Sequence, residues 1–291
     1  MPTIINNGIE LYYEHRGPGI PVIYVHGGFA SLATVLQEPS DEWSWENDFA
    51  AQFHFIWHDR RGCYRSSCPQ DGYDLNSQAR DLKVVIDSLQ LDKVHVIGSS
   101  AGGPISIVFA AQHPDRIRSL ILTGTGLTLF PDADAASSII REQLSILDQH
   151  GSDYAFDHRP SEIEVSFGVL WEPAEMQARR TLTEYTAKQH VLITKAQTLP
   201  KAERVRRYVA ELNNIRAYIG VDIHQYAHAV TAPTLILHGS EDREVPVPWG
   251  QELAQSMRTS QFHLLQGGSH SLMIRDALAR QLAIDFLRRH E

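Results

Sequence analysis

The sequence has few cysteines and no long run of basic residues. Cys63 and Cys68 are its two cysteines, with no second pair to complete a tetrahedral metal site or a disulfide framework, so we expect two ordinary thiols. Lysine and arginine number 26 against 35 acidic residues, which gives a net charge of −9. We expect no nucleic-acid partner, because binding to a phosphate backbone requires clustered positive charge.

Long hydrophobic stretches are also missing. No uninterrupted apolar run approaches the roughly 20 residues of a membrane-spanning helix. The N-terminal stretch MPTIINNGIELYYEHRG lacks the basic start and apolar segment of a leader. We therefore expect a soluble, cytoplasmic protein with no membrane span. Hydrophobic residues make up 43% of the 291, which is enough to bury one large core.

Short apolar, β-branched segments alternate along the chain with helical patterns. The expected strands are nearly continuous in apolar residues, as strands covered on both faces of a parallel sheet should be. These strands span 21–27, 53–59, 93–99, 117–124, 234–242 and 262–270. Apolar residues at helical spacing indicate helices over 76–91 and 276–291. The pattern predicts an α/β fold with a mostly parallel central sheet and helices on both faces.

The stretch 126–230 interrupts this alternation. Its segments are rich in helix-forming residues, and none of them reads convincingly as a strand. We therefore predict a core whose first part spans 1–125 and whose second part spans 231–291. The residues between them are expected to form an inserted helical cap.

The segment HVIGSSAGGP at 95–104 places a small polar cluster directly after an apolar strand. Gly98 and Gly102 lie two residues before and two residues after Ser100, and a helix-like stretch follows. A sharp turn from strand to helix exposes a serine hydroxyl above a sheet, and flanking glycines let the two elements pass closely. This placement makes Ser100, rather than Ser99, the candidate nucleophile.

A glycine-rich turn follows the first of the expected strands, in the sequence HGG at 26–28. Such a turn can direct the backbone N–H of Gly28 at a developing oxyanion, with the N–H of Ala101 as the second donor. Phe29 is the alternative to Gly28. We expect His26 to brace this loop rather than to act as a base.

A carboxylate and an imidazole follow two later strands. Asp242 lies in HGSEDREVP and His270 ends GGSH. Because the carboxyl ends of parallel strands meet at one edge of a sheet, we expect both side chains to lie near Ser100. His270, with an ordinary pKa of about 6.5, can accept the serine proton near neutral pH while Asp242 holds its tautomer. This chemistry requires no metal and no cofactor.

These motifs resemble those of the α/β-hydrolase family from the first expected strand to the final helix. The resemblance rests on HGG at 26–28, HDRRGCYRSS at 58–67, GSSAG at 98–102, GSED at 239–242 and GSH at 268–270. It implies the α/β-hydrolase fold, a helical cap, and Ser100, Asp242 and His270 as nucleophile, acid and base. One branch of the family takes its acid from the strand before the cap, where this chain offers none before Asp132.

A serine nucleophile excludes some of the reactions that this family catalyses. Family members that act on epoxides or haloalkanes place aspartate where this chain has Ser100. We predict a carboxylic ester or lactone hydrolase that acts on a small to medium, partly apolar substrate. Carbon–carbon bond hydrolases, aminopeptidases and cofactor-free perhydrolases use the same three residues and stay open from the sequence alone. A ligand-binding receptor with vestigial turnover is the alternative from a different class.

Substrate contacts are harder to assign. Phe130, Trp171 and Tyr185 are candidates, although aromatic residues on amphipathic helices also build cores. His224 and His228 have the spacing of a helical metal site but lack the glutamate that a zincin helix carries, so no metal is expected. The expected partner is a small-molecule substrate, and the sequence leaves homo-oligomerisation open.

Overall fold

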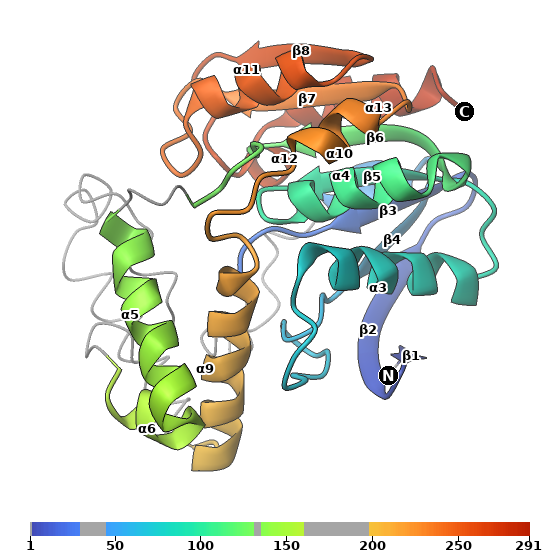
Figure 1. The fold of residues 1–291 in the computed structure, drawn as a ribbon. Helices are drawn as coiled ribbons and strands as arrows, with labels where there is room; N and C mark the ends of the chain where they lie inside the picture. The colour runs from blue at the N-terminus through green and yellow to red at the C-terminus, as the bar shows by residue number, and fades with distance from the viewer. Residues whose placement is uncertain (1, 30–44, 131–134, 160–197) are drawn as a thin grey trace.

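The computed structural model describes residues 2–29, 45–130, 135–159 and 198–291 (Figure 1). These residues contain an eight-stranded sheet with the order β1-β2-β4-β3-β5-β6-β7-β8. Its strands are β1 (Thr3–Asn6), β2 (Ile9–Arg16), β3 (Pro21–Val25), β4 (His54–His58), β5 (Val94–Ser99), β6 (Ile117–Thr123), β7 (Thr234–Gly239) and β8 (Ser260–Leu265).

The sheet is mostly parallel, as expected. β1 pairs antiparallel with β2 and β2 with β4, whereas every pair from β4–β3 to β7–β8 is parallel. The expectations of strand through residues 242 and 270 are wrong, because β7 ends at Gly239 and β8 ends at Leu265. A turn that includes Gly267, with a φ of 73°, follows β8. The β1–β2 hairpin was not expected, although the Asn7-Gly8 pair at its turn is typical of such hairpins.

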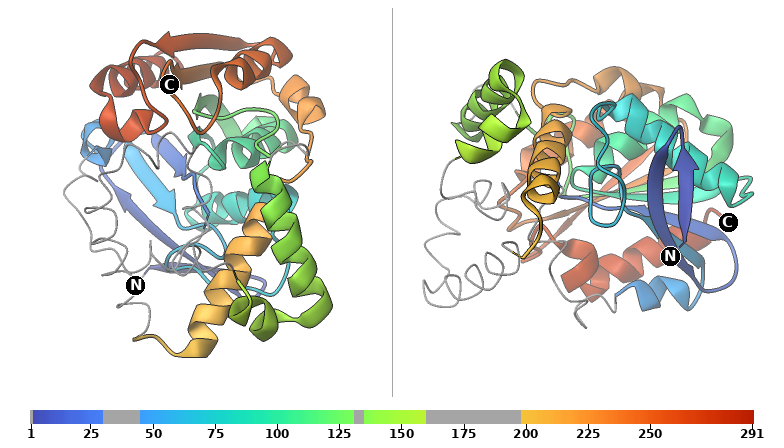
Figure 2. Two further views of the ribbon diagram at one scale, coloured as in Figure 1. Left: turned by 90° about the vertical axis from the view of Figure 1, so that its left-hand side faces the viewer. Right: turned by 90° about the horizontal axis from the view of Figure 1, so that it is seen from below.

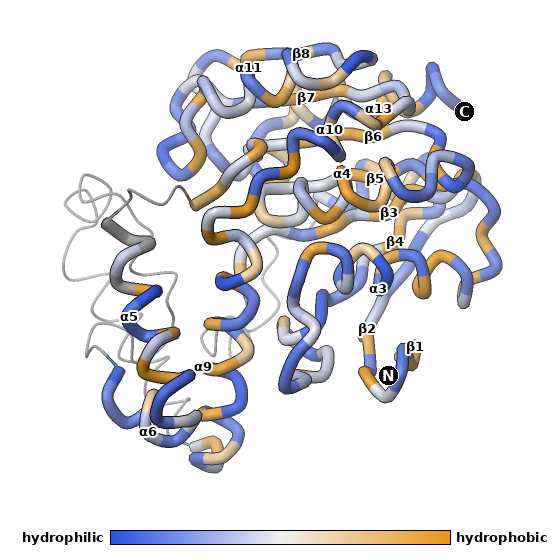
Figure 3. The backbone as a smooth tube through the Cα atoms, in the orientation of Figure 1, coloured by the Kyte–Doolittle hydropathy of each residue, from blue (hydrophilic) through white to orange (hydrophobic). Residues whose placement is uncertain are grey.

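Helices cover both faces of the sheet. Successive residues of a strand point to opposite faces, so Ile23 and Val25 of β3 join one apolar cluster while Val22 and Tyr24 join another. The first cluster includes α3 (Leu75–Ser88), α4 (Gly102–Gln112), α10 (His224–Ala229) and α11 (Val247–Ser256). The second includes α2 (Glu46–Ala50), α12 (Leu272–Arg275) and α13 (Ala277–Arg288). Burial on both faces explains the apolar strands in Figure 3.

Three further helices form a group of their own. α5 (Ala135–His150), α6 (Ser152–Asp157) and α9 (Lys201–Arg216) pack around a separate apolar cluster and lie together in every view (Figures 1 and 2). They fall within the expected cap, whereas α10, from the same stretch, packs into the main core through Ala227. A short 3₁₀ helix, η2 (Pro114–Arg116), leads into β6. In the ranges described, no helix has both the length and the apolar character to cross a membrane.

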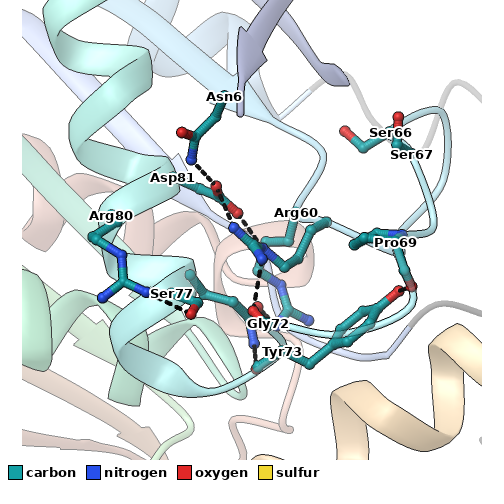
Figure 4. A network of polar contacts seen from close by, with 12 residues as sticks. Asn6, Arg60, Ser66, Ser67, Pro69, Gly72, Tyr73, Ser77, Arg80 and Asp81 are labelled. Atoms are coloured by element: carbon teal, nitrogen blue, oxygen red, sulfur yellow. Dashed lines mark hydrogen bonds and ion pairs between the residues drawn. The ribbon is translucent and has the colours of Figure 1, made fainter. Parts of the chain in front are cut away.

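A buried ion pair joins the turn after β4 to α3 (Figure 4). Arg61 donates from Nε to Oδ2 of Asp81 at 2.6 Å and from Nη2 to Oδ1 at 2.7 Å. Only 6% of the arginine side chain and 2% of the aspartate side chain are exposed. Asn6 also donates to Asp81, and Arg61 donates to the carbonyl of Gly72. This network ties β1, the turn and α3 together.

Replacing one partner of this pair should destabilise the fold. We expect Asp81→Ala to lower the free energy of unfolding by about 3–5 kcal/mol, because the Arg61 charge stays buried without its partner. Asp148→Ala is the control, since its pair with Arg216 is exposed and should contribute less than about 1 kcal/mol. Urea denaturation measures both changes, and equal losses would contradict the role given to the buried pair.

Candidate active site

Ser100 occupies a strained turn between β5 and α4. Its φ is 49°, in the left-handed region that a residue with a side chain seldom adopts. The N–H of Ser100 donates to the carbonyl of Thr123 at 2.9 Å. Its own carbonyl accepts from the N–H of Gly103 at 2.8 Å and from the hydroxyl of Thr125 at 2.9 Å. Contacts with the end of β6 therefore hold the turn on both sides.

The two glycines that flank Ser100 have no room for a side chain. A Cβ on Gly98 would lie 2.6 Å from Oγ of Ser106, and one on Gly102 would lie 2.1 Å from the carbonyl oxygen of Val25. The second contact is to backbone, which cannot move aside without disturbing β3. Close passage of strand and helix therefore explains the spacing of these glycines, as the sequence predicted.

The loop after β3 faces this turn. A Cβ on Gly27 would lie 2.7 Å from Cβ and 3.4 Å from Oγ of Ser100. In the part of the chain that the structure describes, the backbone N–H groups of Gly28 and Ala101 donate to no acceptor. Ala101 also precedes the first turn of α4, where the helix dipole favours negative charge. Ala101 directly follows Ser100, and Gly28 directly follows the glycine that contacts it.

His26 and Arg60 hold the loop after β3 in place through hydrogen bonds. His26 contacts the carbonyl of Gly27 through Nδ1 at 2.8 Å, and its Nε2 accepts the backbone N–H of Arg60 at 3.1 Å. These contacts identify the neutral ring with its proton on Nδ1. Burial and the charge of Arg60 lower the pKa of His26 well below its ordinary value. His26 therefore braces the loop, as expected, and is not poised as a base.

The side chain of Arg60 is a contributor that sequence reasoning missed. The residue is 1% exposed, and its guanidinium donates to the carbonyl of Gly28, to Oε1 of Gln78 and to the hydroxyl of Tyr218. The same hydroxyl donates to the carbonyl of Ala101 at 2.7 Å. Arg60 and Tyr218 thus connect the two residues expected to bind an oxyanion. Arg60 in HDRRG was expected to be structural, but nothing in the sequence indicated these partners.

Asp242 and His270 meet beyond the ends of β7 and β8. Nδ1 of His270 lies 2.9 Å from Oδ2 and 3.1 Å from Oδ1 of Asp242, whose side chain is fully buried. Burial alone would raise the pKa of Asp242, but the hydrogen bond and charge of His270 hold it below its ordinary value. Burial alone would lower the pKa of His270, but the hydrogen bond to Asp242 and the charges of Glu244 and Asp242 raise it.

The end of β6 lies between this pair and Ser100. A Cβ on Gly124 would lie 3.0 Å from Nδ1 of His270 and 3.2 Å from Oδ2 of Asp242. The residue before it, Thr123, accepts the N–H of Ser100. Within the described ranges, no hydrogen bond joins Ser100 to His270, and Nε2 of the ring faces a carboxylate oxygen of Glu244 at 3.4 Å. Asp242 and His270 are in direct contact, whereas Ser100 is their neighbour across β6.

The expected substrate-contact residues have different outcomes. Phe130 is partly buried and packs against Phe29, with ring centroids 5.7 Å apart, directly beside the loop that contains Gly28. Trp171 and Tyr185 lie outside the described residues, as does Asp132, the alternative acid. Phe130 therefore lies close to the candidate site, while the roles of the other two aromatic residues stay predictions.

The remaining candidates for chemistry have ordinary structural surroundings. Burial raises the pKa of the Cys63 thiol to about 12, so this thiol stays protonated at neutral pH. His224 is paired with Asp222, and Nε2 of His228 contacts the guanidinium of Arg258 at 2.7 Å. The two histidines thus have separate partners.

Known proteins resemble this sequence over most of its length. The sequence profile described as alpha/beta hydrolase fold matches residues 20–277. A non-heme haloperoxidase of Rhodococcus erythropolis is 26% identical, over 94% of this chain and 93% of its own length. A 2-hydroxy-6-oxo-2,4-heptadienoate hydrolase of Pseudomonas putida is 26% identical, over 93% of this chain and 90% of its own length.

A solved structure supports the fold independently. An α/β hydrolase enzyme from a deep-sea metagenome library of the Medee basin has a TM-score of 0.72 at 13% identity, covering 100% of this chain and 98% of its own. The relatives carry different activities in their names, so their likeness does not define a substrate. Because the family profile spans most of the sequence and the sheet has the matching architecture, this chain belongs to the α/β hydrolase family.

Proposed function

We propose that this protein is a serine hydrolase that cleaves a carboxylic ester or lactone of small to medium, partly apolar substrates through an acyl-enzyme. The observation that carries the proposal is the left-handed turn at Ser100, next to the Asp242–His270 pair. Strained backbone of this kind persists only where surrounding structure enforces it, and it is concentrated at functional sites. A serine in such a turn presents its hydroxyl to a substrate above the sheet.

The proposed reaction assigns one task to each residue. Oγ of Ser100 attacks the carbonyl carbon and loses its proton to Nε2 of His270, while Asp242 stabilises the imidazolium. The N–H groups of Gly28 and Ala101 receive the developing oxyanion. His270 then protonates the leaving alcohol and, in the second half, takes a proton from the water that cleaves the acyl-enzyme. The hydrogen bond between Ser100 and His270 forms only when substrate is bound. Catalytic hydrogen bonds are often long or poorly aligned in ligand-free enzymes and tighten in the complex.

The helical segment 126–230 supplies selectivity in this proposal. The group of α5, α6 and α9 has its own apolar cluster. Phe29 and Phe130, which lie beside Gly28 and are partly buried, pack against this cluster. A cap that joins the site at this point can control which acyl or alcohol groups enter. We keep Trp171 and Tyr185 as candidate contacts within this segment.

The bond that is cleaved can be tested with a substrate panel. Purified protein should hydrolyse a p-nitrophenyl butanoate and a small lactone with a higher kcat/KM than the matching anilide, because an alcohol leaves more readily than an amine. A 2-hydroxy-6-oxo-dienoate belongs in the panel as a carbon–carbon substrate, given the Pseudomonas putida relative. Faster cleavage of the dienoate than of every ester would overturn the ester assignment.

The three residues should behave as one unit. Ser100→Ala and His270→Ala are each expected to lower kcat by about 10³- to 10⁶-fold, with the double variant scarcely worse, because both belong to one proton relay. Asp242→Asn should cost less, since the nucleophile and base remain. Ser99→Ala is the control and should retain substantial activity. Wild-type ester turnover in Ser100→Ala, with folding verified by circular dichroism, would refute the serine mechanism.

The rate should also depend on pH through His270. Its imidazole must be neutral to accept a proton, and its pKa is raised by the hydrogen bond to Asp242 and the charges of Glu244 and Asp242, against burial. Activity is therefore expected to be full above the raised pKa and to fall as the pH drops through it. The acid limb of kcat/KM for a neutral ester should lie above about 6.5, the ordinary histidine value. An acid limb below that value would contradict the assignment of His270.

A further inference from the structure

Both nitrogens of the His270 ring face a carboxylate. Nδ1 contacts Asp242 at 2.9 Å, and Nε2 lies 3.4 Å from an oxygen of Glu244. The two acids differ in burial, because the Asp242 side chain is fully buried whereas 44% of the Glu244 side chain is exposed. The proposed mechanism uses Asp242 and gives no task to Glu244. Its charge nevertheless lies at the nitrogen that must exchange protons with the substrate.

The backbone of Glu244 is held by the same carboxylate that orients the histidine. Oδ1 of Asp242 accepts the N–H of Glu244 at 3.0 Å and that of Val245 at 2.9 Å. These bonds form a tight loop between β7 and α11, so the start of the glutamate side chain has a fixed place relative to the ring. Glu244 is therefore part of the site and not a surface charge that happens to be near it.

The charges that act on the His270 ring have one sign among the described residues. They come from Asp242 and Glu244, and both groups are acidic. His238 lies on the far side of Asp242, with Nε2 3.5 Å from Oδ2 and 2.9 Å from the carbonyl of Val245. His238 thus contacts the buried acid and not the open side of the ring. On the open side, the described residue that contacts the ring is the acidic Glu244.

We propose that Glu244 selects substrates by the charge of their leaving group, favouring cationic or neutral alcohols and disfavouring alcohols that carry a carboxylate. The inference rests on the proposed function, in which the leaving oxygen takes its proton from Nε2 of His270. A leaving group at that position lies within a few ångströms of the Glu244 carboxylate. At such distances a pair of charges near a protein surface interacts strongly enough to discriminate between substrates.

Three esters with a common acyl group test this selection. Butanoyl choline, 3,3-dimethylbutyl butanoate and the butanoate ester of 3-hydroxypropanoate carry cationic, neutral and anionic leaving groups. In Glu244→Gln we expect the cationic-to-neutral ratio of kcat/KM to fall, and the anionic-to-neutral ratio to rise, each on the order of tenfold at low ionic strength. The wild-type preference should weaken as salt is added, because the carboxylate is half exposed.

Two further variants separate charge from structure. Glu241→Gln removes the same charge from an exposed position in the same loop, and its ratios should equal those of the wild type. Glu244→Asp keeps the charge and should retain the direction of the preference. The acid limb of kcat/KM should also move to lower pH in Glu244→Gln, because one of the charges that raise the pKa of His270 is gone. A loss of loop structure alone would not produce this pattern.

Labelling with an aryl phosphonate distinguishes the two ways in which the test can fail. If the phosphonate does not modify Ser100 in the wild type and no ester is turned over, the proposed function is wrong. If Ser100 is modified in both proteins and the ester ratios of Glu244→Gln match the wild type, the serine mechanism stands and the selection by Glu244 is wrong. Ratios altered equally in Glu241→Gln would also overturn it, since any nearby charge would then suffice.

Discussion

The left-handed backbone of Ser100 is the constraint on which the candidate site depends. An L-residue adopts this conformation at a cost, and here the cost is offset by three hydrogen bonds that join Ser100 to Thr123, Gly103 and Thr125. The bonds to Thr123 and Thr125 exist because β5 and β6 are parallel neighbours whose carboxyl ends coincide, whereas the bond from Gly103 comes from the start of α4. The sheet thus determines where the hydroxyl lies. Gly98 and Gly102 have no room for a side chain for the same reason. The chain must turn from β5 into α4 within a few residues, which brings backbone and side chains close to both glycines.

Arg60 and His26 support the loop that contains Gly28, and the proposed mechanism gives them no chemical step. Arg60 is almost fully buried and contacts Gln78, Tyr218 and the carbonyl of Gly28 through its guanidinium. His26 is kept neutral by burial and by the adjacent charge. In the proposed function this loop presents a backbone N–H to the oxyanion, and support of this kind favours that task because donors in fixed positions stabilise a developing charge without reorganisation. The buried pair of Arg61 and Asp81 extends this support to α3.

Asp242 contacts both His270 and the backbone of the loop that contains Glu244. One oxygen of its carboxylate lies closest to Nδ1 of His270, and the other accepts the N–H groups of Glu244 and Val245. The orientation of His270 and the position of Glu244 are therefore coupled through one buried group. In the proposed function, this coupling links the proton relay to the choice of substrate. It arises within the four residues from Asp242 to Val245, in the loop between β7 and α11.

The sequence by itself determined the class of fold and the presence of the six strands of the parallel part of the sheet, because apolar runs and strand ends are local signals. Glycine spacing and strand ends also pointed to three residues for the proposed chemistry. The sequence did not predict the β1–β2 hairpin, although Asn7-Gly8 is a local cue, and it extended the last strand past the turn at Gly267. Only the tertiary structure decided that Arg60 would meet Tyr218, that α10 would join the main core, and that Glu244 would face His270. These contacts join residues 158 and 26 positions apart, or separate elements, and no periodicity along the chain encodes them. They form because parallel strands bring distant segments to one edge of the sheet, where packing and charge select the partners.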